Sequence, residues 1–154
     1  MFNEQEWLKV LFLLNDTQAW IDGMAKELFT QLPIADKKKF LRKNYYLSAT
    51  VLAHILERHY HKIERYTEAG KFTIPVTDIL DYLREAYSLP VKPVPGCANF
   101  QRLVHTNRVI GYDRHRKPVK TITILTDGGG NIVTAFPGPL YAEMLSEEGM
   151  LVRN

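Results

Sequence analysis

The sequence is poor in cysteine, with Cys97 as the single example among 154 residues. One cysteine cannot close an intrachain disulfide, and it leaves no partner for a cysteine-based zinc site. These two absences exclude the disulfide-stapled and zinc-ribbon classes of small protein. A reducing compartment, the cytoplasm, is the environment we expect.

Long hydrophobic runs are also missing. The longest nearly apolar run, from Val10 to Leu14, is far shorter than the roughly 20 residues that cross a membrane. Glu4 and Glu6 stand near the N-terminus, where an export signal would be basic. We therefore expect a soluble protein without a membrane partner. Apolar residues at 45% and charged residues at 24% are ordinary for a globular domain with a real core.

The excess of positive charge is small, since the formal net charge is only +3, but the basic residues are unevenly distributed along the chain. Between residues 101 and 120 the chain has one acidic residue, Asp113. The basic residues of the same segment are Arg102, Arg108, Arg114, Arg116, Lys117 and Lys120. This pattern favours a polyanionic partner, although loop charges kept for solubility explain it equally well.

The periodicity of apolar residues divides the chain into helices followed by strands. Residues 1–46 predict a helical N-terminal arm, with helices at 2–14, 17–31 and 35–43. Further helices are expected at 48–66, with Ser48 as N-cap, and at 77–87, with Thr77 as N-cap. The Pro-rich stretch 90–96 then ends helical structure.

Alternating apolar residues after position 99 predict strands at 100–106, 108–112, 119–126 and 132–136. The fold class is therefore α+β, with N-terminal helices followed by a small antiparallel sheet of about four strands. We divide the chain into the arm, residues 1–46, a main domain, residues 47–140, and a loose tail, residues 141–154, within which 140–146 could form a short helix.

Two imidazoles and a guanidinium lie close together on the helix predicted at 48–66. His54, Arg58 and His59 supply a proton carrier that works near neutral pH and a fixed cation for phosphate. A helical wheel places His59 on the apolar side, and His54 with Arg58 on the opposite flank. A histidine on an apolar face is more often a hydrogen-bonded core residue than a catalyst, so both interpretations stay open.

Other motifs are weaker. Thr134 sets a hydroxyl between Ile132 and Phe136 on one face of the last predicted strand. The Gly-rich segment 127–131 predicts a hairpin turn rather than a phosphate loop, because no helix with Lys-Ser/Thr follows it. His54, His59 and His61 do not share one helix face and no HExxH motif is present, so we expect no metal unless loop residues such as His105 or Asp113 contribute.

Several of these features together resemble a known family. The helical His54-x3-Arg58-His59, the later Ile110-Gly111-Tyr112, and the final strand Gly130-Asn131-Ile132-Val133-Thr134-Ala135-Phe136-Pro137 resemble the barnase, EndoU, colicin and RelE-like (BECR) ribonuclease superfamily. The likeness is strongest to its phage and polymorphic-toxin branches and covers about residues 47–138. The N-terminal arm has no counterpart in it.

The resemblance implies a metal-independent RNA endonuclease that cleaves by attack of the ribose 2′-hydroxyl without a cofactor, with tRNA among the substrates of the superfamily. It places the catalytic histidine at His54 or His59, the arginine at Arg58 and the strand hydroxyl at Thr134. A basic sheet residue would be Lys120, Arg102 or Arg108. Substrate-binding residues would be Arg102, Arg108, Arg114, Arg116 and Phe136.

The resemblance also implies RNA as a partner, an immunity or inhibitor protein as a further one, and action in the cytoplasm, including that of a target cell. Two alternatives remain at this point. The chain can be a non-catalytic module of a phage or mobile element that binds nucleic acid or protein, with structural histidines. A metal hydrolase is the other.

Overall fold

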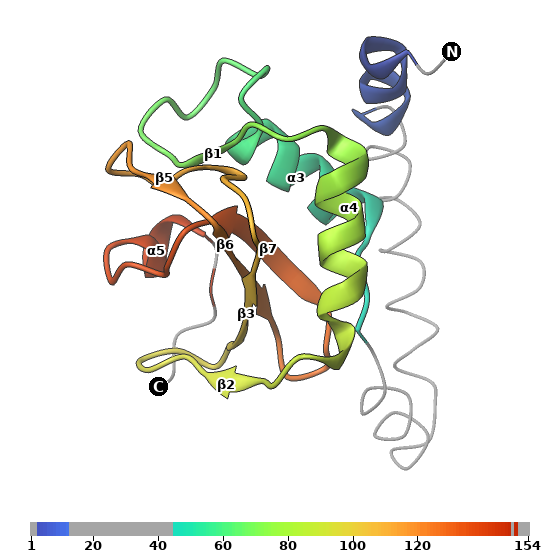
Figure 1. The fold of residues 1–154 in the computed structure, drawn as a ribbon. Coiled ribbons are helices and arrows are strands. Elements are labelled where there is room, and N and C mark those ends of the chain that lie inside the picture. The colour runs from blue at the N-terminus through green and yellow to red at the C-terminus, as the bar shows by residue number, and fades with distance from the viewer. Residues whose placement is uncertain (1–2, 13–44, 149, 151–154) are drawn as a thin grey trace, which may run out of the picture.

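The structure is a computed structural model that describes residues 3–12, 45–148 and 150. Residues 4–12 are helical, as the sequence predicts, whereas the helices expected at 17–31 and 35–43 lie outside the described residues. Figure 1 shows helices α3 and α4 on one side of a twisted sheet and the short α5 on the other side. No helix among the described residues has the length and apolarity needed to span a membrane.

The strands form two antiparallel sheets, and the α+β class is thereby confirmed. A four-stranded sheet has the order β2-β3-β6-β7, and a three-stranded sheet has the order β1-β4-β5. The first contains Lys92–Pro93, Phe100–His105, Thr121–Thr126 and Ile132–Pro137. The second contains Lys71–Phe72, Gly111–Tyr112 and Pro118–Val119.

The prediction of one sheet with a continuous strand over 119–126 was wrong. Val119 ends β5 and pairs with Gly111, whereas Thr121 starts β6 and pairs with His105. Between them, the Lys120 carbonyl accepts hydrogen bonds from the backbone and the hydroxyl of Thr106. Most residues of the run are β-branched, so its sequence alone does not show where the strand changes partner.

Helix α3 spans Ala49–His59 and begins as predicted. The Ser48 hydroxyl accepts a hydrogen bond from Val51 N at 3.1 Å, which satisfies one free donor of the first turn. The helix ends seven residues before the predicted Tyr66, because Tyr60 turns to an extended conformation and forms a bridge with Phe72 of β1. Pairing with a strand distant in sequence therefore outweighs local helix propensity.

The other helices also differ from their predicted bounds. Helix α4 spans Val76–Glu85 and a 3₁₀ turn, η1, covers Ala86–Ser88. Pro75, not Thr77, precedes the helix and makes no side-chain cap. Strand β2 includes Pro93 inside the Pro-rich stretch, which is tolerated because β2 lies at the edge of its sheet. Helix α5 is short, Met144–Glu147.

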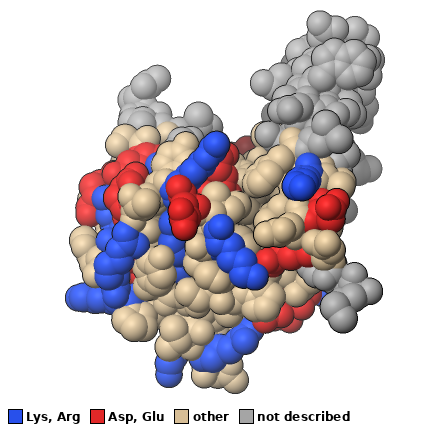
Figure 2. Space-filling view, turned by 90° about the horizontal axis from the view of Figure 1, so that it is seen from above, with Lys and Arg blue, Asp and Glu red and all other residues tan. Residues whose placement is uncertain are grey.

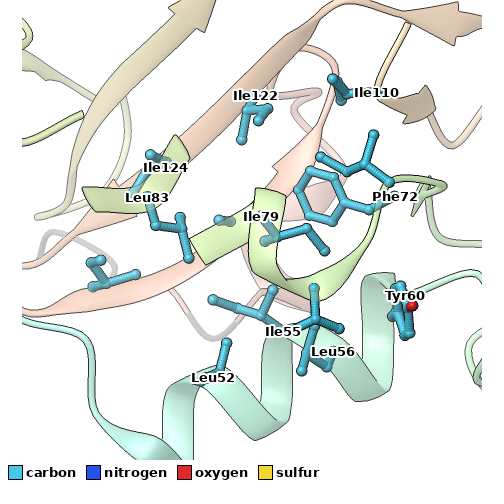
Figure 3. Packing of buried hydrophobic residues seen from close by; sticks show 14 of the residues in the cluster. Leu52, Ile55, Leu56, Tyr60, Phe72, Ile79, Leu83, Ile110, Ile122 and Ile124 are labelled. Carbon is cyan, nitrogen blue, oxygen red and sulfur yellow. The ribbon is translucent and has the colours of Figure 1, made fainter. Parts of the chain in front are cut away.

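Two apolar clusters hold these elements together. The larger one lies between α3, α4 and the sheet, and Figure 3 shows Ile55, Leu56 and Ile79 facing Ile122 and Ile124 across it. Truncating such a buried Leu or Ile to Ala typically costs about 2–5 kcal/mol. The second cluster lies near the C-terminal end of the described chain. It contains Val94, Cys97, Leu125, Phe136, Met144 and Met150.

Both ends of the predicted main domain make contacts beyond its boundaries. Tyr46 N donates to the Gly130 carbonyl at 3.1 Å, and Ile132 N donates to the Tyr46 carbonyl at 2.8 Å. At the other end, Met144 is 5% exposed and Glu148 is 3% exposed. Residues 141–148 are therefore packed onto the sheet rather than loose, and we call them the C-terminal segment.

Candidate functional site

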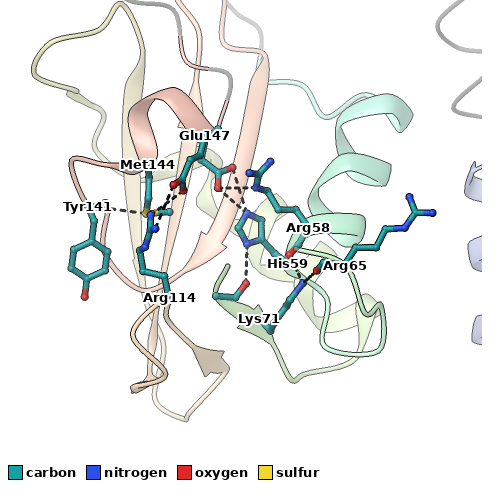
Figure 4. A network of polar contacts seen from close by, with 10 residues as sticks. Arg58, His59, Arg65, Lys71, Arg114, Tyr141, Met144 and Glu147 are labelled. Carbon is teal, nitrogen blue, oxygen red and sulfur yellow. Dashed lines mark hydrogen bonds and ion pairs between the residues drawn. The ribbon is translucent and has the colours of Figure 1, made fainter. Parts of the chain in front are cut away.

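The C-terminal end of α3 brings His59 against β7 and the C-terminal segment (Figure 4). The His59 side chain is fully buried. Its Nδ1 lies 2.9 Å from the carbonyl oxygen of Gly70, and its Nε2 lies 3.1 Å from Glu148 Oε1. The ring of Phe136 lies 5.8 Å away, between centroids. The wheel prediction that His59 faces the core is confirmed.

The partners of His59 decide where its protons are. A carbonyl oxygen and a carboxylate both accept, so hydrogen bonds at both nitrogens require either the imidazolium or a protonated Glu148. Burial by itself would raise the pKa of Glu148, but the hydrogen bond from His59 and the charges of His59 and Arg58 lower it. The carboxylate form of Glu148 is therefore favoured, and it lies against His59 Nε2.

Arg58 contributes the second cation. Its Nε lies 3.5 Å from Glu148 Oε1, and its guanidinium carbon lies 4.4 Å from the centre of the Tyr66 ring. The side chain is 13% exposed. Arg58 thus sets a guanidinium, the group that best binds carboxylate and phosphate, beside the Glu148 carboxylate.

Thr134 of β7 brings a hydroxyl to the same place. Its Oγ1 is buried and has no hydrogen-bond partner of acceptable distance and angle within the described chain. It is nevertheless close enough to Glu148 to contribute to lowering the pKa of that carboxyl. A buried hydroxyl without a partner costs stability, which is typical of positions kept for function.

His54, one and a half turns earlier on α3, is half-buried. Burial lowers the pKa of His54; the charges of Arg58 and His59 lower it further, and the charge of Glu148 opposes them. His54 is therefore neutral at pH 7 and able to accept a proton. The two candidate histidines thus sit in different environments: His59 is fully buried against Glu148, whereas His54 is half-buried.

The structure separates the other predicted residues from this group. Lys120 is exposed between β5 and β6, and none of its described contacts reaches His59. Arg102 is buried beside β6, with its guanidinium 4.6 Å from the Tyr45 ring and 3.4 Å from the Thr126 hydroxyl. Phe136 is buried under His59, so it supports the ring and is not an exposed platform for a base.

Three other arginines of the basic segment are engaged in three different places. Arg108 pairs with Asp78 of α4 at 2.8 Å, and Arg114 pairs with Glu147 of α5 at 2.9 Å. Arg116 donates to backbone carbonyls of residues 67 and 69. Figure 2 accordingly shows basic and acidic side chains interspersed on this end of the molecule, without one continuous basic face.

Sequence reasoning missed Glu148, the central carboxylate. The sequence predicts a loose tail, and no role is assigned there to its glutamates. The only signal was the apolar spacing of Met144, Leu145 and Met150 around them, which is compatible with packing on a sheet. Among the described residues, no group of three His, Cys, Asp or Glu side chains is placed to hold a metal ion.

The arrangement thus places one buried carboxylate between Arg58 and His59, with a second imidazole, His54, earlier on the same helix. Comparison with known proteins adds no relative. No family model, curated protein or solved structure matches this chain.

Proposed function

We propose that this chain is a metal-independent RNA endonuclease of the BECR type. The observation that carries the proposal is the convergence of Arg58, His59 and Thr134, three side chains from two distant elements, around one buried anion, the Glu148 carboxylate. Helix and final strand are the two elements from which the resemblance draws its catalytic groups. In substrate-bound protein, the scissile phosphate would take the place of Glu148.

Each group then has a role that follows from its surroundings. Neutral His54 accepts the proton of the ribose 2′-hydroxyl, and the oxygen attacks phosphorus. The bond to the 5′-oxygen breaks, and the imidazolium of His59 supplies the proton to that leaving group. Arg58 and the Thr134 hydroxyl stabilise the negative charge on the phosphorane. The products are a 2′,3′-cyclic phosphate and a 5′-hydroxyl.

Access requires a change of conformation. His59 and Thr134 are fully buried, and Glu148 occupies the position between the cations. The C-terminal segment that carries Glu148 is held by contacts near the surface, including the Arg114 pairs with Glu147 and Glu143 and a 3.0 Å hydrogen bond from Tyr141 to Asp113. Release of these contacts would withdraw Glu148 and open the site to RNA.

The test is cleavage of a labelled RNA by the full chain in EDTA, with the new 3′ ends identified by mass spectrometry. We expect 2′,3′-cyclic phosphate ends and a rate loss of about 10²- to 10⁴-fold in each of His59→Ala and His54→Ala. His105→Ala is the matched control, because His105 is exposed on β3. Cleavage that both site variants leave unchanged contradicts the mechanism, and cleavage that EDTA abolishes indicates a metal hydrolase instead.

A second candidate function is a non-catalytic binding module. The complete burial of His59, with both ring nitrogens hydrogen-bonded, favours it, because structural histidines are satisfied in this way. The same assay separates the two functions. A binding module gives no cyclic-phosphate product with any variant, including those that loosen the C-terminal segment.

A further inference from the structure

We propose that a surface pocket near the candidate site binds one phosphate-bearing nucleotide of a single-stranded RNA. The backbone of Gly70 and Lys71 separates this pocket from His59. The pocket lies between residues 61–67 and the β4–β5 hairpin and has a volume of about 500 Å³. A cavity of this size falls in the range of small-ligand sites. The lining residues that could recognise a ligand are His61, Arg65, Lys71, Tyr112 and Arg116, with Glu64 as the only carboxylate.

The pocket has more positive than negative charge. Burial lowers the pKa of Lys71, and the charges of Arg116 and Arg58 lower it further, while Glu68 opposes them. The Lys71 ammonium donates to the carbonyls of Arg58, at 2.6 Å, and Arg65. Arg65 pairs with Glu57 in an exposed bridge, which is of little energetic worth. A phosphate entering the pocket would offset the repulsion between the Lys71 ammonium and the guanidinium groups of Arg58 and Arg116.

The walls of the pocket are held in place by backbone of unusual conformation. Tyr66 and Arg116 are non-glycine residues with positive φ, 52° and 64°, and such strain persists only where the surroundings fix it. Arg116 donates to the carbonyls of Thr67 and Ala69, which ties the two walls together. Its guanidinium lies 5.2 Å from the centre of the Tyr112 ring.

These groups match the two halves of a nucleotide. The Tyr112 ring and the Arg116 guanidinium beside it offer flat surfaces on which a base can stack, and Arg65 offers donors to a phosphate. His61 donates from Nδ1 to the Phe72 carbonyl at 2.8 Å, which leaves Nε2 as an acceptor for a sugar hydroxyl.

The pocket adjoins the candidate active site. The Gly70 carbonyl receives the His59 hydrogen bond, and Lys71 lines the pocket. Tyr66 stacks on Arg58, while its neighbours Arg65 and Thr67 line the pocket. An RNA strand held at the pocket would therefore lie next to the site that we propose for cleavage. This assignment to RNA rests on the proposed function, whereas the binding of a nucleotide does not.

The experiment titrates the full chain with adenosine 5′-monophosphate and measures affinity by calorimetry. We expect binding that weakens about tenfold in Arg65→Gln and in Arg116→Gln, the loss of one good contact each. Glu64→Gln should bind more tightly, because it removes the only carboxylate. Arg84→Gln, which loses an exposed pair with Asp81 on α4, should bind like the parent protein. Absent binding, or equal affinity in all variants, overturns the pocket.

A second arm assigns the pocket to RNA. A 2′-O-methyl oligonucleotide, which cannot be cleaved by the proposed mechanism, should displace the monophosphate. Failure to displace it overturns the assignment to RNA. Because this chain need not cleave anything in either arm, nucleotide binding without RNA cleavage would contradict only the proposed function, and cleavage without nucleotide binding would contradict only the pocket.

Discussion

Glu148 places a carboxylate between Arg58, at 3.5 Å, and His59, at 3.1 Å, with 1% of its side chain exposed. Removing one member of a buried charge group leaves the others uncompensated, which costs more than the group contributes when complete. The same residue that stabilises the described conformation also blocks the proposed phosphate position. Stability and activity should therefore respond in opposite directions to changes at this residue.

The acid dependence of stability tests the charge of Glu148. Its pKa in the folded protein is lowered from 4.5, so its contribution to stability is present above about pH 4.5 and is lost as the pH falls through the folded pKa. Glu148→Gln should remove this part of the acid dependence and cost about 3 kcal/mol at pH 7. Urea unfolding between pH 3 and 7 measures both effects.

The matched control for that experiment is Glu147→Gln. Glu147 is the neighbouring residue, and its pair with Arg114 is 38% exposed on the glutamate side. Exposed pairs contribute at most about 1 kcal/mol. Equal losses of stability in the two variants would show that Glu148 carries no special charge interaction.

At Thr134 we expect a substitution to affect activity much more than stability. Thr134→Val removes a buried hydroxyl that makes no hydrogen bond of acceptable geometry and interacts only weakly with Glu148, so the free energy of unfolding should fall by well under the roughly 1 kcal/mol of a complete hydrogen bond. Cleavage should fall at least about tenfold, because a donor to the phosphorane is lost. Urea unfolding and single-turnover cleavage are the two measurements.

Thr123→Val is the control for Thr134→Val. Thr123 is also buried in the sheet, but its hydroxyl donates to the Gly138 carbonyl at 2.7 Å. Its loss should destabilise the protein by about 1 kcal/mol without a comparable effect on the chemical step. A Thr134 variant that loses stability as Thr123→Val does would mean that the hydroxyl is a structural one.

At the scale of elements, the contact between β1 and β4 positions the Gly70 carbonyl, which precedes β1 and is hydrogen-bonded to His59. A Cβ on Gly111 would lie 2.2 Å from the Lys71 carbonyl oxygen, whereas a Cβ on Gly128 would meet nothing within 4 Å. Gly111→Ala must therefore push the two strands apart and should cost more than about 2 kcal/mol, while Gly128→Ala should stay within about 0.5 kcal/mol. Thermal unfolding of the two variants, side by side, tests the difference.

Local patterns were sufficient to predict some elements and not others. The Ser48 cap and strands β3 and β7 follow from hydrogen-bonding chemistry and alternation within a few residues. The end of α3 depends on pairing of Tyr60 with Phe72, and the division of 119–126 between two sheets depends on partners elsewhere in the chain. Such long-range contacts leave no periodic trace in the sequence.

The same distinction applies to the site. Arg58, His59 and Thr134 were chosen for their chemistry, and the packing of α3 on β7 brings them together. Glu148 is 89 residues from His59 and was invisible because a solvated glutamate and a buried one look alike in sequence. Lys120 was named because the resemblance calls for a basic sheet residue, but it lies between β5 and β6, away from His59.

For the molecule as a whole, the C-terminal segment covers the site. The ion pairs and hydrogen bonds that hold this segment can be removed one at a time. Arg114 is 17% exposed and pairs with both Glu143 and Glu147. Arg114→Ala should favour the open form and increase cleavage several-fold at equal protein concentration. Arg84→Ala, which removes an exposed pair within α4, is the control. Unchanged cleavage in Arg114→Ala would mean that RNA enters by another route.

Cys97 provides a chemical measure of that opening without any introduced label. It is the only thiol in the sequence, is 1% exposed, and packs in the same cluster as Met144 and Met150. Its rate of reaction with an aromatic disulfide should be slow in the parent protein and faster in Arg114→Ala, in proportion to the fraction of time that the thiol is uncovered. The rate at which the coloured aromatic thiolate is released therefore reports how often the fold opens around Cys97.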